Sequence, residues 1–500
     1  MVFAASLWLL AAACELFLYK WLPSDKVRLW FGAGVIALLL VSGGALVALH
    51  PVVWLPAWVV GCYRVINILR VMQYRLPHAE LQRISIRAYS WLLTAQAVVT
   101  AVAWLVHTHR NMAWYGFDIL VALQVLSVLV VLRVSVNTWR HTRPNDVTTS
   151  LPDKELPSVS VLVPARNETD ALEQCLAALV ASNYPKLEIV VLDDCSANRR
   201  TPDIIRSFAQ SGVRFVQGDA PDESRWLAKN QAYDRLAQEA NGEILIFCGV
   251  DVQFAPNTVR SLVELLLRKD KDMMSVLPMR AQSVWAEASL LQPMRYFWEI
   301  CLPRRFFKRP PVLSTCWLIT AEALIRAGGF EAVSRSITPE AHFARQAVIG
   351  DRYSFIRADA ALGVVSTKPV HEQYDTTVRT RYPQLHRRLE LVAVTTLLEL
   401  ALLLGPLIGL LTLWRFPHKV LLGSIWLVLV LVLEAVYYLV AVRTKLNSPF
   451  LSWLLFPAAA VVDIGMLHVS MWKYEFGTVN WKGRNVCIPV MRVEPRLPKI

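Results

Sequence analysis

Apolar positions in this chain gather in long stretches near its two ends, whereas the middle part alternates short apolar runs with polar turns. A stretch of about 20 apolar residues forms a helix long enough to cross a hydrocarbon layer ~30 Å thick. We therefore expect about five membrane helices in the N-terminal part. They correspond to Val2–Tyr19, Leu29–His50, Pro51–Ile68, Ala88–His107 and Gly116–Val136.

Three further apolar stretches follow near the C-terminal end, at Leu391–Trp414, Val420–Val442 and Pro449–Trp472. The last contains Pro457 and Asp463, which are costly in lipid unless they face other helices or a cavity. Three full crossings would place the basic C-terminal tail outside the cell, against the positive-inside rule. We expect one of the stretches to be re-entrant, so that the tail stays inside.

Basic residues cluster in three loops of the N-terminal part, at Lys20–Arg28, Arg70–Arg87 and Arg133–Arg143. With five helices, all three loops lie on one side of the membrane, which the positive-inside rule makes cytoplasmic. If the third helix lies flat on the membrane, the N-terminus changes sides but the middle part does not. We therefore expect the middle part on the cytoplasmic face of the cell membrane.

The middle part contains three short runs rich in Val, Ile and Leu, at Val159–Val163, Leu187–Leu192 and Glu243–Cys248. Such runs, bounded by polar turns and separated by segments of helical period, are typical of buried parallel strands. Ligands of open α/β sheets bind just outside the carboxyl ends of the strands. Because carboxylates follow two of these runs and a polar turn follows the third, we predict a ligand site at that edge.

The composition excludes several classes of protein. With 500 residues, 55% of them hydrophobic, and a mean hydropathy of +0.39, the chain is too apolar for a soluble protein of this size. A net charge of +13 could indicate nucleic acid. Beside membrane segments, attraction to anionic lipid headgroups is the simpler explanation, and we expect no nucleic-acid partner. The eight cysteines lack metal-ligand spacing and are expected to be reduced.

Several motifs follow one another in the middle part. Pro164–Glu168 reads P-A-R-N-E, Asp193–Ser196 reads D-D-C-S, and Trp226–Asn230 reads W-L-A-K-N. With the acidic motif after the third run, they resemble a family 2 inverting glycosyltransferase with a GT-A fold, over about Pro157–Arg345. Membrane-bound members that glycosylate lipids, such as the hopanoid-associated and carotenoid glycosyltransferases, look most similar. They often end in W-K-G-R, as Trp481–Arg484 does here.

The resemblance implies an α/β GT-A domain, with a Rossmann-like mixed sheet, inserted between N-terminal and C-terminal transmembrane helices. It implies a nucleotide sugar as donor, with a UDP-sugar expected, and a lipid as acceptor. The expected parts are residues 1–140 (N-terminal membrane helices), 141–157 (linker), 158–370 (GT-A domain), 371–390 (basic interfacial segment), 391–472 (C-terminal membrane helices) and 473–500 (basic tail).

The resemblance assigns six residues to the donor site: Pro164, Glu168, Asp193, Asp194, Lys229 and Asp251. A carboxylate at Asp193 or Asp194 could accept hydrogen bonds from a uracil or ribose edge. Asp-Asp-Cys-Ser is also good capping chemistry before a helix, so a structural turn is the alternative. Lys229 could contact the diphosphate as a point cation, and a solvated lysine is the alternative there.

Asp251 matches the last acidic residue of the family's D-x-D motif, which implies a ligand of Mg²⁺ or Mn²⁺. Such an ion acts as a Lewis acid on the diphosphate and orients the leaving group. The first acidic position is Gly249 in this chain, so the site has one carboxylate fewer. Metal binding is then weakened, or another ligand serves. Alternatively, Asp251 only caps the loop before Pro256.

Glu340 is the expected general base. Ser336–Arg345 follows a Gly-Gly-Phe turn and resembles the family's G-G-F…E-D-x-x-L-A-R, which places Glu340 on the Asp that deprotonates the acceptor. A Glu carboxylate is one methylene longer, so its helix must sit slightly farther back to reach the proton. Pro339 suits a first helical turn. The alternative is an ordinary acidic residue favoured by the helix dipole.

Two basic motifs are expected at the acceptor or membrane interface. Arg379 and Arg381 lie in a segment that faintly resembles the Q-R-x-R-W of processive polysaccharide synthases, and contact with lipid headgroups is favoured for them. Trp481, Lys482 and Arg484 fit an interfacial Trp with cations that bind a lipid phosphate or dock on the domain.

The resulting hypothesis is transfer of one sugar, with inversion, from a nucleotide sugar to a lipid acceptor. Two alternatives stay open. One is a processive polysaccharide synthase, against which the weak Q-R-x-R-W match counts. The other is a non-catalytic membrane subunit that binds a nucleotide sugar, which Gly249 and the Pro339-Glu340 variant favour.

Overall fold

The computed structural model describes residues 2–21, 25–46, 51–73, 78–108, 110–144, 151–222, 225–281, 290–302, 310–415, 418–444 and 454–487. Its contacts divide the chain into two compact units. The helical unit comprises Met1–Ser127, Val378–Leu427 and Ile464–Val479, and the sheet unit comprises Val128–Thr377, Val428–Asp463 and Asn480–Ile500. Residues 488–500 of the expected basic tail lie outside the described residues.

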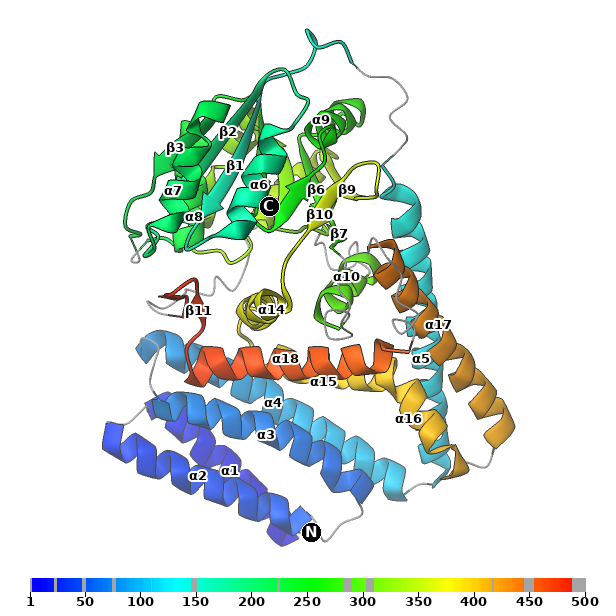
Figure 1. Ribbon diagram of the computed structural model, residues 1–500. Coiled ribbons are helices and arrows are strands. Elements are labelled where there is room, and N and C mark those ends of the chain that lie inside the picture. Colours follow the sequence, from blue (N-terminus) through cyan, green and yellow to red (C-terminus); the bar gives the residue numbers. More distant parts are fainter. Residues whose placement is uncertain are drawn as a thin grey trace. The chain divides into compact units, whose positions relative to one another are not determined.

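Helices at both ends of the chain coincide with the apolar stretches (Figure 1). Those within the helical unit are α1 (Val2–Trp21), α2 (Asp25–Leu46), α3 (Pro51–Gln73), α4 (His78–Thr108), α15 (Leu389–Leu398), the π-helical segment η4 (Glu399–Leu404), α16 (Gly405–Leu411) and the 3₁₀ turn η5 (Leu413–Arg415). The helices that continue from one unit into the other are α5 (Arg110–His141), α14 (Val370–Gln384), α17 (Lys419–Arg443) and α18 (Phe456–Phe476).

Within the described residues, five helical stretches are long and apolar enough to cross a membrane. They are Lys26–Gly44, Ala79–Leu105, Gly116–His141, Leu389–Leu411 and Lys419–Arg443. Each overlaps an expected span. Helices α1, α3 and α18 also coincide with expected spans, and their crossing of a membrane stays a prediction, as does the sidedness of the loops.

Three charged residues that interrupt the expected spans, Glu15, Arg64 and Asp463, have partners inside the protein. In the helical unit, Arg64 Nε donates to Glu15 Oε2 at 2.9 Å, and Arg64 Nη1 donates to Gln96 Oε1 at 2.6 Å. In the sheet unit, buried Asp463 accepts a hydrogen bond from Trp298 Nε1 at 2.8 Å. The expectation that Asp463 faces protein is confirmed, because a charge in an apolar helix is tolerated only with such a partner.

The sheet unit is built on a seven-stranded mixed sheet with the order β3-β2-β1-β4-β8-β6-β9. The first four of these strands are parallel, β8 is antiparallel to both of its neighbours, and β6 and β9 are parallel. The strands are β1 (Val159–Ala165), β2 (Leu187–Asp193), β3 (Val213–Gln217), β4 (Ile244–Cys248), β6 (Met273–Leu277), β8 (Cys316–Thr320) and β9 (Tyr353–Arg357). A small second sheet contains β5 (Val252–Phe254), β10 (Val364–Ser366) and β7 (Met279–Arg280).

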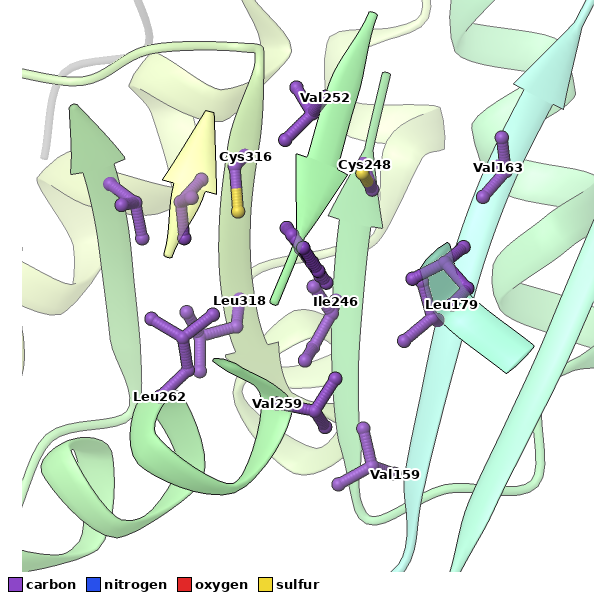
Figure 2. Packing of buried hydrophobic residues seen from close by; sticks show 14 of the residues in the cluster. Val159, Val163, Leu179, Ile246, Cys248, Val252, Val259, Leu262, Cys316 and Leu318 are labelled. Atoms are coloured by element: carbon purple, nitrogen blue, oxygen red, sulfur yellow. The ribbon is translucent and has the colours of Figure 1, made fainter. Parts of the chain in front are cut away.

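The three apolar runs predicted as strands are β1, β2 and β4, and their parallel pairing is confirmed. Alternate side chains of each strand enter different clusters, because successive residues point to opposite faces of a sheet. Val161 and Ile246 belong to one cluster, and Leu162 and Phe247 to the other. Figure 2 shows the first cluster, where Leu179 and Leu262 lie against the strands.

Helices cover both faces of this sheet. α6 (Asp170–Val180) and α9 (Thr258–Arg268) contribute to the first cluster, and α8 (Ala228–Glu239) and α13 (Pro339–Ile349) contribute to the second. In the second cluster, the ring of Trp317 stacks on that of Phe247 at 4.2 Å and faces Phe343 of α13 at 5.8 Å. This aromatic layer fixes α13 to the sheet. The remaining helical segments of the domain are α7 (Arg200–Ser207), η1 (Ala209–Ser211), α10 (Leu291–Cys301), α12 (Ala321–Arg326) and η3 (Phe330–Val333).

A short hairpin follows α18, formed by β11 (Asn480–Trp481) and β12 (Arg484–Asn485). Its two loop residues, Lys482 and Gly483, both have positive φ, at 48° and 82°. Two consecutive residues of this kind are typical of a type I′ turn, whose twist matches that of the strands it joins. The W-K-G-R motif is therefore a tight hairpin, which belongs to the sheet unit.

Candidate active site

The carboxyl ends of β2, β1 and β4 lie side by side, because the three strands are parallel neighbours with β1 in the centre. The chain continues from β1 to β2 on one side and returns to β4 on the other. Open α/β sheets bind ligands at such a reversal of strand order. The polar turns after these strands, with Glu168, Asp194 and Asp251, therefore meet at one edge of the sheet.

Asp193, the last residue of β2, organises the turn that follows it. Its Oδ1 accepts hydrogen bonds from the amide of Ser196 at 3.3 Å and from the Ser196 hydroxyl. The Ser196 hydroxyl oxygen also accepts from the amide of Asn167 at 2.9 Å. Asn167 and Cys195 both have positive φ, at 50° and 51°, a conformation that side chains rarely adopt. The contacts of Asp193 are thus those of the alternative in which this residue holds a structural turn.

Asp194 is paired with the C-terminal hairpin. Arg484 Nη1 lies 2.7 Å from Asp194 Oδ2, and the side chains are only 13% and 7% exposed. Burial raises the pKa of Asp194 above its ordinary value, although Arg484 and Arg166 act to lower it. For the W-K-G-R motif, we expected either binding of a lipid phosphate or docking on the domain. In the structure, Arg484 docks on the domain.

Lys482 joins two carboxylates. Its Nζ lies 2.9 Å from Glu168 Oε1 and 3.6 Å from Glu372 Oε1, which belongs to α14. Burial raises the pKa of Glu168, and the nearby Glu372 and Asp251 carboxylates add to the rise, against the effect of Lys482. Burial by itself lowers the pKa of Lys482. The carboxylates of Glu168 and Glu372 more than offset this effect, so the pKa of Lys482 is raised above its ordinary value.

Arg166 and Asn167 bind the backbone of the hairpin, a role that the sequence did not reveal. Arg166 Nε donates to the carbonyl of Lys482 at 2.9 Å, and Asn167 Nδ2 donates to the same oxygen at 3.3 Å. Arg166 Nη1 also reaches the carbonyls of Asp194 and Cys195, both at 2.6 Å. The P-A-R-N-E turn thus holds both the β2 turn and the hairpin. In the sequence, the signal for this role was the pair of polar residues between Ala165 and Glu168. Their partner, Lys482, lies about 315 positions away, so the contact could not be read from the sequence.

Asp251 lies in the turn between β4 and β5 and is paired with a lysine. Asp251 Oδ2 lies 3.2 Å from Lys368 Nζ, which follows β10. Burial raises the pKa of Asp251, but Lys368 and Lys229 more than offset it, and the pKa is lowered. A Cβ added at Gly249 would lie 2.5 Å from Asp251 Oδ1. The Asp251 carboxylate therefore occupies space next to Gly249 that a side chain at that position would need.

These residues do not fit the divalent cation expected at Asp251. In the described part of the chain, no group of three or more His, Cys, Asp and Glu side chains is arranged to hold a metal. The carboxylates Glu168 and Asp251, which lie within electrostatic range of each other, are each paired with a lysine instead. Mg²⁺ is commonly held by one or two carboxylates together with substrate phosphates, and here the ammonium of Lys368 already occupies the Asp251 oxygen that such an ion would need.

Lys229 and Asn230, of the W-L-A-K-N motif, lie in the first turn of α8. The Lys229 ammonium lies 5.0 Å from the ring centre of Tyr233 and lowers the pKa of Asp251 by its charge. Asn230 is buried, and its Nδ2 donates to the carbonyls of Val333 at 2.9 Å and Ser336 at 2.7 Å. Asn230 thus ties the start of α8 to the loop that leads into α13.

Glu340 lies in the first turn of α13 and is 2% exposed. It is three residues before Phe343, so the two side chains share a helix face. Because Phe343 packs in the aromatic layer, that face points into the domain. Pro339 is the first residue of the helix, as expected. His342, on the same helix, contacts the carbonyl of Ala327 through Nε2 at 3.1 Å.

The other expected residues are not part of these turns. Pro164 is the last residue but one of β1, paired in register with Leu192, where the pairing of β1 with β4 has ended. Arg379 and Arg381 belong to the helical unit. The carbonyl of Arg379 accepts from the hydroxyl of Tyr474 at 2.7 Å, and Arg381 Nη2 contacts Glu399 at 3.0 Å. Trp481 is half-buried in β11.

A family model described as "Glycosyl transferase family 2" matches residues 160–328, from β1 to the turn after α12. This chain contains a glycosyl transferase family 2 domain. The domain has the mixed, Rossmann-like sheet of the GT-A fold, so the expected family and fold class are confirmed, with apolar helices on both sides of the domain in the sequence.

Individual relatives of the glycosyl transferase family 2 domain match over a limited length. The chain is 37% identical over 107 residues to "Probable glycosyltransferase YdaM" of Bacillus subtilis (strain 168), which is 21% of this chain and 24% of that one. It is 28% identical over 123 residues to "4,4'-diaponeurosporenoate glycosyltransferase" of Staphylococcus haemolyticus (strain JCSC1435), which is 24% of this chain and 32% of that one. The chain spans about a quarter of the length of the first curated relatives it matches.

Among solved structures, the mannosyltransferase PcManGT from Pyrobaculum calidifontis, in complex with GDP-Man and Mn2+, aligns with a TM-score of 0.41 and 18% identity. The alignment covers 71% of this chain and 98% of that one.

Proposed function

We propose that this chain is a membrane-bound glycosyltransferase that transfers one sugar, with inversion, from a nucleotide sugar to a lipid acceptor. The observation that carries the proposal is the set of paired acids and cations at the edge where β1, β2 and β4 end, within a glycosyl transferase family 2 domain. Such an edge is where α/β sheets bind nucleotides.

The donor would bind along this edge. Asp194 is proposed to accept hydrogen bonds from the base or ribose of the nucleotide, because it directly follows β2 and its side chain is engaged by Arg484 of the C-terminal hairpin and not by its own turn. Asp193, whose Oδ1 is engaged by Ser196, is proposed to hold the turn in shape. Lys229 would face the diphosphate as a point cation.

Glu340 is proposed as the general base. The acceptor hydroxyl oxygen would form a bond to the anomeric carbon from the face opposite the leaving group, and Glu340 would take the hydroxyl proton. The nucleoside diphosphate would leave with the electron pair of the broken bond. The burial of Glu340, and the anchoring of its helix by Phe343 and Asn230, support this role, because a general base must be held within reach of its proton.

A lipid acceptor is proposed because the domain lies, in sequence, between helices apolar enough to cross a membrane. Such helices give a lipid hydroxyl access to a protein from the bilayer. A relative named as a diaponeurosporenoate glycosyltransferase is consistent with an apolar acceptor.

The test uses the full-length protein in vesicles of total membrane lipid, supplied in turn with radiolabelled UDP-glucose, UDP-N-acetylglucosamine and GDP-mannose. We expect label to enter the lipid fraction with one of these donors. Glu340→Gln should bind that donor normally and lose transfer by roughly 10²–10⁴-fold. Glu331→Gln, which replaces a 73%-exposed carboxylate on the preceding turn, is the matched control.

Three outcomes separate the alternatives. Donor binding without transfer in the wild type indicates the non-catalytic subunit. Label in a long water-soluble polymer indicates the processive synthase. Unchanged transfer in Glu340→Gln removes Glu340 as the base.

A further inference from the structure

We propose that Lys368, assisted by Lys229, takes the place of a metal ion in this domain, so that the chain binds a nucleoside diphosphate without a divalent cation. The proposal deepens the proposed function, because it concerns how the same donor site neutralises the diphosphate.

The first observation is the position of Lys368. Its Nζ lies 3.2 Å from Asp251 Oδ2, and the side chains are 17% and 14% exposed. The residue before it, Thr367, donates its amide to the carbonyl of Asp251 at 2.8 Å. The backbone therefore holds the segment after β10 against the turn after β4, and Lys368 is placed where a cation bound by Asp251 would lie.

The second observation is the space at Gly249. The Asp251 carboxylate turns back toward Gly249, where an added Cβ would lie 2.5 Å from Oδ1. A carboxylate at position 249 would need Asp251 to move away. The absence of an acidic side chain at position 249 and the contact of Lys368 with Asp251 are thus two parts of one arrangement, in which an ammonium group takes the place of a divalent ion.

The third observation is the balance of charge. Two ammonium groups, Lys368 and Lys229, act on the single carboxylate of Asp251 and outweigh the effect of its burial. Both ammonium groups carry donors that phosphate oxygens accept well. The neighbouring carboxylates Glu168 and Glu372 share the ammonium of Lys482.

Lysine can act in this way because its ammonium is a compact point charge with three donors, and lysines bind phosphates elsewhere as point charges. It does not polarise an oxygen as strongly as a divalent ion. The departing diphosphate would therefore be stabilised by more than one cation: Lys368, which contacts Asp251, and Lys229, whose charge acts on Asp251.

The experiment measures binding of UDP and of GDP to the full-length protein in detergent, by calorimetry, with excess EDTA and again with Mn²⁺. We expect one of the two nucleotides to bind with the same affinity, within about twofold, in both conditions. Lys368→Met should lose about tenfold or more of that affinity in EDTA, the effect of one charge-assisted hydrogen bond. Lys368→Arg should retain most of it.

The matched control is Lys186→Met. Lys186 precedes β2, at the opposite end of the strand from Asp194, and its ammonium contacts the carbonyl of Leu156 at 2.7 Å. If Lys368→Met unfolds because it strands the Asp251 carboxylate, the double variant Lys368→Met/Asp251→Asn removes the buried charge and should show the same loss of affinity. The melting temperature of each variant identifies that case.

Wild-type affinity that falls tenfold or more in EDTA overturns the proposal, as does unchanged affinity of both Lys368→Met and the double variant. Either result leaves the proposed glycosyltransferase function intact. If neither nucleotide binds in either condition, the donor site itself is wrong, and the proposed function fails together with this inference.

Discussion

Replacing Arg484 by Met should release the C-terminal hairpin from the sheet unit. The change keeps most of the side chain's length and apolar stem but removes its charge. Arg484 Nη1 lies 2.7 Å from Asp194 Oδ2, and Nη2 lies 3.3 Å from the Asp194 carbonyl. Both side chains are largely buried, so the pair is more than a solvated surface ion pair.

A hydrogen bond to a charged group contributes about 1.5–3 kcal/mol to stability. The variant should therefore shift the equilibrium between docked and released hairpin by roughly 10–150-fold, since about 1.4 kcal/mol corresponds to a factor of ten. The remaining contacts, from Arg166 and Asn167 to the Lys482 carbonyl, keep part of the docking.

Hydrogen exchange of the amides in Asn480–Asn485, followed by mass spectrometry, measures this equilibrium directly. Protection should fall by the predicted factor in Arg484→Met and stay unchanged in Arg199→Met, which alters an exposed arginine of the β2–α7 loop. A double-mutant cycle with Asp194→Asn isolates the pair. Effects of the two changes that simply add, or unchanged protection in Arg484→Met, would refute the reasoning.

Three further predictions concern the domain. Gly242→Ala should lower the melting temperature markedly, because its Cβ would overlap the backbone of β1 and would lie 2.7 Å from the carbonyl carbon of Val159; an unchanged melting temperature contradicts this. Phe343→Ala should cost about 3–5 kcal/mol of unfolding free energy in denaturant titration, because the ring is fully buried; a cost below ~1 kcal/mol would show that α13 is not anchored there. The pKa of Glu168 is raised on folding, so the folded state holds more protons between the ordinary and the raised value. As the pH rises through that range, the stability of the wild type should therefore fall relative to that of Glu168→Gln. Melting temperatures of the two proteins that change in parallel with pH would contradict a raised pKa of Glu168.

Local pattern was sufficient for much of the domain. The runs that became β1, β2 and β4 were recognisable because strands buried on both faces are continuously apolar, and the polar turns after them marked their carboxyl ends. The first helical turn with Pro339 and Glu340 followed from residue preferences that act within one turn of helix. The helices long and apolar enough to cross a membrane followed from length and hydropathy.

Charge partners were not predictable, because they join positions far apart in the sequence. The interruption of two apolar stretches by Glu15 and Arg64 reads as a defect in each helix, and only the packing of α1 with α3 turns it into a buried pair. Likewise, the composition of Trp481–Arg484 leaves two arrangements open, binding of a lipid phosphate or docking on the domain. Its docking at β1 and β2 depends on where the chain returns after α18.

The sequence by itself therefore determined the class of the molecule, an α/β domain of the glycosyl transferase family 2 between apolar helices, and the edge where its candidate site lies. It also showed that Gly249 departs from the acidic motif. Only the tertiary structure decided which cation pairs with Asp251. Asp251 and Lys368 are separated by more than a hundred residues and meet through the pairing of β5 with β10. Electrostatic pairing depends on distance in space, and hydropathy and local propensity carry no record of that distance.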